Sequence, residues 1–71
     1  MTDSVDARGL SCPQPVILAR QRMQSMGRGV FEVKVDTDTA RENITRLAQK
    51  EGWDVEIREA GREYVLVLTR G

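Results

Sequence analysis

Cys12 is the one side chain in this sequence that could act as a covalent nucleophile at neutral pH without a separate base. The chain contains no histidine and no second cysteine. Those absences exclude Cys–His and Ser–His–Asp catalysis, His-ligated metals, an internal disulfide and a CxxC redox pair. We therefore expect no metal site, and any covalent chemistry has to use Cys12.

Two prolines determine how Cys12 is presented. A residue before a proline is driven out of the helical region, which predicts Cys12 as the N-cap of a helix and Pro13 as its first residue. The positive end of the helix dipole favours a thiolate at that position. Because Pro13 and Pro15 have no N–H, only Gln14 and Val16 can donate early amides, so we expect a moderately lowered thiol pKa.

Positive charge gathers in the same part of the chain. Residues 1–28 carry four arginines against two aspartates, a net charge of +2, which leaves −2 for the remainder. Arg8, Arg20 and Arg22 could therefore add Coulombic support to a Cys12 thiolate. A stiff, exposed sulfur suits a carrier that docks with another protein better than an enzyme that encloses its substrate. The alternative is that Cys12 is a small buried apolar residue, as free cysteines often are.

The length and the charge balance narrow the possible functions further. The 71 residues fit one small domain, 1–71, with no room for separate cofactor and substrate domains. Eleven basic residues balance eleven acidic ones, so we expect no stable nucleic-acid or membrane binding. Nothing in the sequence demands a dimer, so we expect a monomer. No apolar run could span a bilayer and no leader peptide is recognisable, which predicts a cytoplasmic protein.

The hydrophobic pattern predicts the element order β-α-β-α-β-β, an α/β (α+β) fold. Helical stripes predict one helix from Cys12-Pro13 to a stop at Gly27, and a second from a Thr39–Glu42 capping box to Gly52. Alternation predicts strands at 4–8, 30–36, around 55–57 and at 64–69, with a turn over 60–62. These elements predict a two-layer sandwich, with both helices on one face of a four-stranded mixed sheet.

The core is expected from the apolar stripes of the helices and from the strands, with Trp53 as a core or edge anchor. The last strand is apolar on both faces, so it lies inside the sheet or a partner covers its outer face. Acids near the second helix are expected to favour its dipole in preference to holding a metal. The expected stripes are Val16, Ala19, Met23 and Met26, then Ala40, Ile44, Leu47 and Ala48, and the acids are Asp36, Asp38 and Glu42.

Residues 5–16 resemble the CPxP signature of the TusA/SirA-like sulfur-carrier family. The resemblance rests on Asp6, Gly9, Cys12, Pro13 and Pro15 at this spacing, and the length and element order fit the family over residues 4–70. It implies that Cys12 accepts sulfane sulfur as a persulfide and passes it to a partner. The resemblance also implies that the protein uses no cofactor and has no turnover of its own without its partners.

The same resemblance implies partners and supporting residues. The donor would be a cysteine desulfurase or a rhodanese-type protein, and the acceptor another sulfur-relay protein or a biosynthetic enzyme. Gln14 departs from the glutamate common in members that act in tRNA thiolation. The residues expected to support Cys12 are Asp6, Arg8, Gly9, Pro13, Gln14, Pro15 and Arg20.

The second half of the chain is similar to the N-terminal domain of YedF-like proteins, at residues 36–43 and 52–55. Those sulfurtransferase-like proteins are associated with selenium metabolism and usually carry a second, DsrE-like domain. The similarity implies a link to selenium. It leaves open whether this chain stands alone or is a piece of a two-domain protein.

Two other functions stay open on the residues alone. The first is a non-catalytic interaction or regulatory module, in which the CPxP turn only caps a helix and the open sheet face binds a partner. That face would centre on Glu32, Lys34, Glu56, Arg58 and the last strand. The second is a thiol redox sensor, which would need a mixed disulfide or a dimer because the chain has no resolving cysteine. A Cys12 thiol titrating at or above about 8.5 would argue against both thiol functions.

Overall fold

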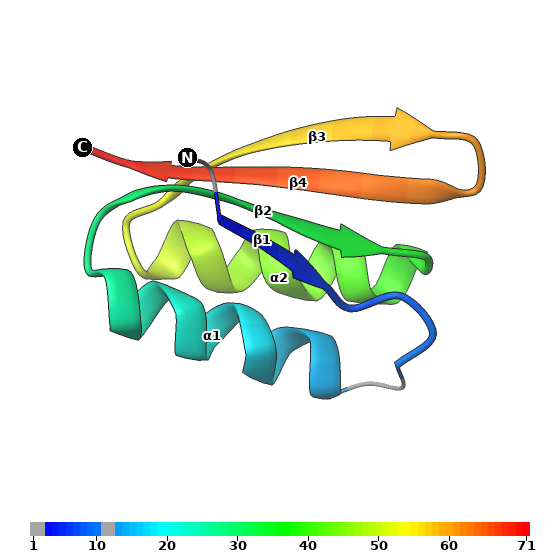
Figure 1. Ribbon diagram of the computed structural model, residues 1–71, viewed down its shortest axis with the longest axis horizontal. Helices are drawn as coiled ribbons and strands as arrows, with labels where there is room; N and C mark the ends of the chain where they lie inside the picture. The colour runs from blue at the N-terminus through cyan, green and yellow to red at the C-terminus, as the bar shows by residue number, and fades with distance from the viewer. Residues whose placement is uncertain (1–2, 11–12) are drawn as a thin grey trace.

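The computed structural model describes residues 3–10 and 13–71. Its elements are β1 (Asp3–Asp6), α1 (Gln14–Met26), β2 (Gly29–Val35), α2 (Asp38–Lys50), β3 (Asp54–Ala60) and β4 (Glu63–Arg70). Both helices lie on one face of a four-stranded sheet (Figure 1). The predicted element order and two-layer architecture are confirmed. Within the described residues, neither helix is long and apolar enough to cross a membrane.

The sheet has the strand order β1-β2-β4-β3, with β1 parallel to β2 and the other two pairs antiparallel. β4 therefore lies inside the sheet, which explains its apolar residues on both faces. Leu66 and Leu68 are fully buried under the helices. Val65 and Val67 alternate with them on the open face, where they are half-buried.

Phe31 and Trp53 form the aromatic centre of the core. Their rings meet edge to face, with centroids 5.4 Å apart and planes at 81°. Phe31 is fully buried and Trp53 is 2% exposed, so of the two places predicted for Trp53, the core or its edge, the structure shows the core. The predicted helical stripes surround this pair. Their buried members are Ala19, Met23, Ala40, Ile44 and Ala48, and Val16, Met26 and Leu47 are partly buried at the edge.

α1 begins one residue later than predicted. Its N-cap is Pro13, whose carbonyl accepts a hydrogen bond from the Ile17 N–H at 3.0 Å. Pro15, and not Pro13, occupies one of the first helical positions that proline favours. The prediction of a Cys12 N-cap is therefore wrong, and Cys12 itself lies outside the described residues. At the other end, Gly27 stops the helix as predicted, with φ +73° and its N–H bonded to the Met23 carbonyl at 2.9 Å.

α2 also begins at a different residue. Thr37 is extended at φ −133° and ψ 149°, and its hydroxyl accepts a hydrogen bond from the Ala40 N–H at 3.2 Å. This geometry makes Thr37 the N-cap, because an N-cap side chain bonds the amide two or three residues on. The predicted Thr39–Glu42 capping box is therefore wrong.

Candidate functional site

The residues that flank Cys12 lie at one end of the molecule. β1 runs into this end, and both α1 and α2 start from it, beside the β3–β4 turn (Figure 1). The predicted strand 4–8 ends as β1 at Asp6, and the Ala7 N–H still donates to the Lys34 carbonyl at 2.9 Å. The site is therefore built from segments 6–10 and 13–17, on either side of the cysteine.

Arg8 fastens the chain before Cys12 to two strands. Its Nε and Nη2 donate to the two carboxylate oxygens of Asp6 at 2.8 Å each, and its Nη1 donates to Glu63 Oε2 at 2.8 Å. The Arg8 backbone N–H also donates to Asp6 Oδ1 at 3.1 Å. The Arg8 side-chain hydrogen bonds hold the pKa of Asp6 well below its usual range, and Asp6 in turn raises the pKa of Arg8. The Arg8 charge is therefore matched by neighbouring carboxylates.

Asp6→Asn is expected to remove part of the acid sensitivity of folding. Because Arg8 lowers the Asp6 pKa in the folded chain, the carboxylate stabilises the fold fully above its unfolded pKa of about 3.9. That contribution is lost as the pH falls toward the lower folded value. It is modest because the pair is exposed to solvent.

Thermal unfolding measured between about pH 7 and pH 2 tests this prediction. The melting temperature of wild type should fall more steeply below about pH 4 than that of Asp6→Asn. Asp54→Asn, at an exposed carboxyl on β3, serves as the control and should keep the wild-type slope. Identical slopes for wild type and Asp6→Asn would contradict the assignment.

Gly9 continues the fastened segment. Its N–H donates to Asp36 Oδ2 at 3.0 Å, which joins the loop after β1 to the end of β2. Gly9 has φ +76°, and an added Cβ would meet no atom within 4 Å. Glycine is therefore required for the backbone conformation and not for space. Together with the Arg8 contacts, this bond fixes the chain two residues before the undescribed segment.

Two acids near α2 also bind other elements. Asp36 binds Gly9, and Asp38 accepts a hydrogen bond from the Tyr64 hydroxyl of β4, which raises the Tyr64 pKa. The Arg41 guanidinium lies over the Tyr64 ring, 4.9 Å from its centroid. Asp38 also lies in the first turn of α2, as the dipole interpretation expects. In the described part of the chain, no group of three or more acidic, histidine or cysteine side chains could hold a metal ion.

Exposed apolar side chains lie on both sides of Cys12 in the sequence. Leu10 is 39% exposed and Ile17 is 41% exposed, and Pro13 is exposed as well. Pro15 is fully buried and anchors the first turn of α1 to the core. The two prolines of the motif therefore differ, because Pro13 is exposed to solvent and Pro15 is buried. Exposed apolar side chains of this kind suit contact with another protein.

The start of α1 is also electrostatically favourable to an anion. Gln14 is its exposed first residue, and no acidic side chain lies in its first turn. Arg20 lies further along the helix and lines a small hollow with Met23 and Trp53. Electrostatic support of Cys12 by Arg8 and Arg20 stays a prediction. The carboxylates that pair with Arg8 reduce the support expected from Arg8.

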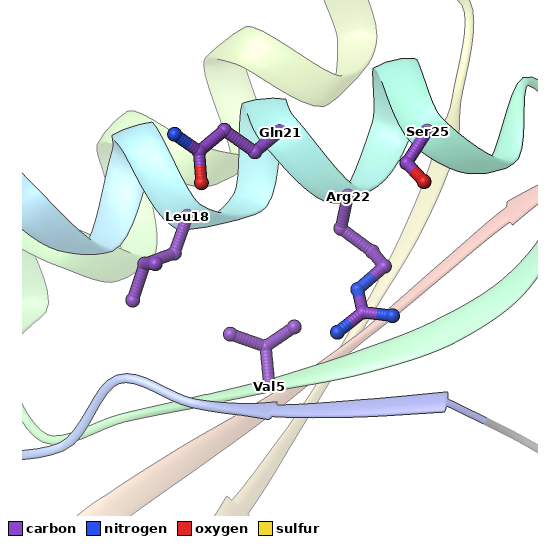
Figure 2. A pocket seen from close by; sticks show the side chains of 5 residues that line it. All are labelled: Val5, Leu18, Gln21, Arg22 and Ser25. Atoms are coloured by element: carbon purple, nitrogen blue, oxygen red, sulfur yellow. The ribbon is translucent and has the colours of Figure 1, made fainter.

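Two further hollows border α1, and only one of them reaches the site. Figure 2 shows the first, of about 320 Å³, where Leu18, Gln21, Arg22 and Ser25 of α1 lie over Val5 of the edge strand. Its lining includes no sequence neighbour of Cys12. The second, of about 360 Å³, lies between α1 and α2 and is lined in part by Pro13.

The sequence reasoning missed the second hollow. Its residues from α2 are Asn43, Arg46, Leu47 and Lys50, a 3–4–7 spacing that places them on one helix face. The stripe spacing predicts Leu47 as a core residue and gives no sign that Arg46 and Lys50 border a hollow. The signal that could have found the hollow was this mixed apolar and basic face.

Comparisons with known proteins agree with the architecture. The family model described as "Sulfurtransferase TusA" matches residues 3–70. A Thermotoga maritima protein named "Putative sulfur carrier protein" is 35% identical over 63 residues, covering 86% of this chain and 80% of its own length. The crystal structure of a SirA-like protein from Desulfitobacterium hafniense matches with a TM-score of 0.92 and 30% identity, covering 99% of each chain.

Proposed function

The chain belongs to the TusA sulfurtransferase family, and on that premise we propose that Cys12 holds sulfane sulfur as a persulfide and relays it between proteins. Family membership and the sulfur-carrier relative support the carrier role. The observation that carries the assignment to Cys12 is the way its neighbours are held. Arg8 and Gly9 are fastened before it, and Pro15 is buried after it.

The transfer step needs only thiol chemistry. The Cys12 thiolate attacks the outer sulfur of the donor's persulfide, R–S–SH, and a new S–S bond forms as the donor's S–S bond breaks. The donor leaves as its thiolate, R–S⁻, and Cys12 becomes Cys12–S–SH, which loses its proton to water. Handing the sulfur on repeats the step with Cys12 as the leaving thiolate. The exchange has no net oxidation or reduction, so it requires no cofactor.

The start of α1 supports this chemistry by charge and by stiffness. Backbone N–H groups at the helix N-terminus come from Gln14 and Val16, and the helix dipole favours the anionic persulfide. Prolines at 13 and 15 restrict the backbone, so less conformational entropy is lost when another protein docks. Both effects favour a carrier whose sulfur is used by partners.

Partners and setting follow from the same proposal. The donor is a cysteine desulfurase or a rhodanese-type protein, and the acceptor is a further relay protein or a biosynthetic enzyme. We place the protein in the cytoplasm, where a reducing poise keeps a lone cysteine available as a thiol, and we expect a monomeric domain spanning 1–71. A link to selenium stays a prediction. It is tested by asking whether selenide replaces sulfur on Cys12.

Cold cyanolysis tests the proposal chemically. Cyanide takes the outer sulfur of a persulfide, returning the Cys12 thiolate and releasing thiocyanate. After treatment with inorganic polysulfide and desalting, wild type should release about one thiocyanate per chain, as expected for a single persulfide-forming thiol. If no thiocyanate is released and the protein instead forms a disulfide-linked dimer that dithiothreitol reduces to monomers, the redox-sensor alternative is favoured.

Gly9→Ala is expected to slow sulfur transfer as well as to weaken the fold. Forcing alanine to φ +76° costs about 1 kcal/mol of unfolding free energy. A backbone shift next to the Cys12 segment should also slow relay by up to about tenfold, because reacting atoms tolerate little misplacement.

Gly52→Ala is the matched control. Gly52 has φ +85°, and an added Cβ there would also meet no atom within 4 Å, but Gly52 follows α2 at the far end of the molecule. Urea unfolding should give similar losses for the two variants, whereas only Gly9→Ala should transfer slowly. Equal transfer rates would show that the loop geometry is not used.

A further inference from the structure

A groove between the two helices opens beside the residue that follows Cys12. We name it the α1–α2 groove, and its lining residues are Pro13, Val16, Asn43, Arg46, Leu47 and Lys50. Its volume is about 360 Å³, enough for a large side chain. Because Pro13 lines it, the groove begins one peptide bond away from the proposed sulfur carrier.

The groove combines an apolar floor with a basic rim. Pro13, Val16 and Leu47 supply the apolar surface, and Val16 and Leu47 remain partly exposed although they pack against the core. Arg46 and Lys50 are exposed and lie one turn apart on α2. A ligand that fills this groove therefore has an apolar part and a negative part.

The charge of the whole helical layer has the same sign. α1 and α2 together carry five basic and two acidic residues, a net charge of +3, so the rest of the chain carries −3. α1 contributes two arginines and no acid. A negatively charged surface is therefore attracted to the helices and not to the sheet, and this attraction speeds encounter.

We propose that the α1–α2 groove docks the protein that loads Cys12, through an apolar side chain of that protein flanked by carboxylates. The proposal rests on the proposed function and names a recognition surface for it. A protein is favoured over a nucleic acid because the groove lining contains no aromatic side chain on which a base could stack. The apolar floor has no use in binding phosphates.

Charge reversal in the groove tests the proposal. The variant Arg46→Glu/Lys50→Glu is compared with Lys34→Glu/Arg58→Glu, which makes the same charge change on the open face of the sheet, where both residues pair with Val65. A second variant, Arg46→Gln/Lys50→Gln, removes the two charges without reversing them. It is expected to fold even if the glutamate variant does not, because glutamine is a good helix former. Circular dichroism establishes folding. Intact-protein mass spectrometry follows sulfur loading from a purified cysteine desulfurase with L-cysteine, and separately from inorganic polysulfide.

Loading by the desulfurase should be roughly tenfold slower in Arg46→Glu/Lys50→Glu, and less slow in the glutamine variant, because the attraction that speeds encounter is reversed or removed. The control variant should stay within about twofold of wild type, because its charges lie away from the docking surface. Polysulfide is a small anion that responds to the reversed charge but does not fill the groove, so its loading of the groove variants should slow much less than loading by the desulfurase. Added salt should slow wild type more than the groove variants.

Three other results would contradict docking in the α1–α2 groove and leave the proposed carrier function standing. These are an unchanged desulfurase rate in the groove variants, an equal loss in the control variant, or a wild type loaded by polysulfide but not by the desulfurase. Retention of transfer RNA by wild type and not by Arg46→Glu/Lys50→Glu would give the groove a different occupant and overturn it too. Failure of wild type to take sulfur from either source would instead overturn the proposed function, and the groove with it.

Discussion

Cys12→Ser is expected to abolish sulfur relay while the domain remains folded. A serine hydroxyl does not form a persulfide, and the chain has no second cysteine that could substitute for it. Relay of labelled sulfur from L-cysteine, through a desulfurase and this protein, to a downstream acceptor should fall to the level without the protein. Partial activity in the variant would mean that the protein assists transfer without carrying sulfur.

The stability of Cys12→Ser separates chemistry from folding. Serine differs from cysteine by one atom, and the proposed carrier role requires an exposed Cys12, so the unfolding free energy should change by no more than about 0.5 kcal/mol. Urea unfolding followed by circular dichroism measures this change. A variant that unfolds would make Cys12 a structural residue and favour the interaction module.

Phe31→Ala is expected to have the largest effect on stability. Phe31 is fully buried in a central strand, and its ring packs on Trp53. Truncating a buried phenylalanine costs about 3–5 kcal/mol, while domains have only about 5–15 kcal/mol in total. A domain of 71 residues should lie toward the lower end of that range, so the variant should be largely unfolded at physiological temperature.

Val30→Ala is the matched control on the same strand. Val30 precedes Phe31 but is 38% exposed, so its truncation should cost well under about 1 kcal/mol. Fluorescence of Trp53, the one tryptophan of the chain, reports unfolding in urea for both variants. Equal midpoints for the two variants would contradict the central place of Phe31 in the core.

The fold could be predicted because its signals are local. Strict alternation in β2 and the stripe Ala40, Ile44 and Ala48 in α2 match the observed burial. The starts of the helices could not be predicted as well, because several neighbouring residues can cap a helix and the chain conformation before it decides among them. Thr37 and Thr39 are both competent caps, and only Thr37 is extended at the helix start.

The candidate site, like the fold, could be predicted only in part. The cysteine and its prolines are recognisable from the sequence because they are contiguous. The contacts that hold them were not predictable, since Arg8 binds Glu63, 55 residues away, and Gly9 binds Asp36, 27 residues away. The α1–α2 groove likewise exists only because two helices pack side by side.

Intact-protein mass spectrometry after incubation with a cysteine desulfurase and L-cysteine tests the central claim most directly. Wild type should gain the mass of one sulfur atom and lose it again on treatment with dithiothreitol, and fragmentation should place that atom on Cys12. Cys12→Ser should gain nothing under the same conditions. A folded wild type with its thiol free that gains no sulfur from the desulfurase or from polysulfide would contradict the account.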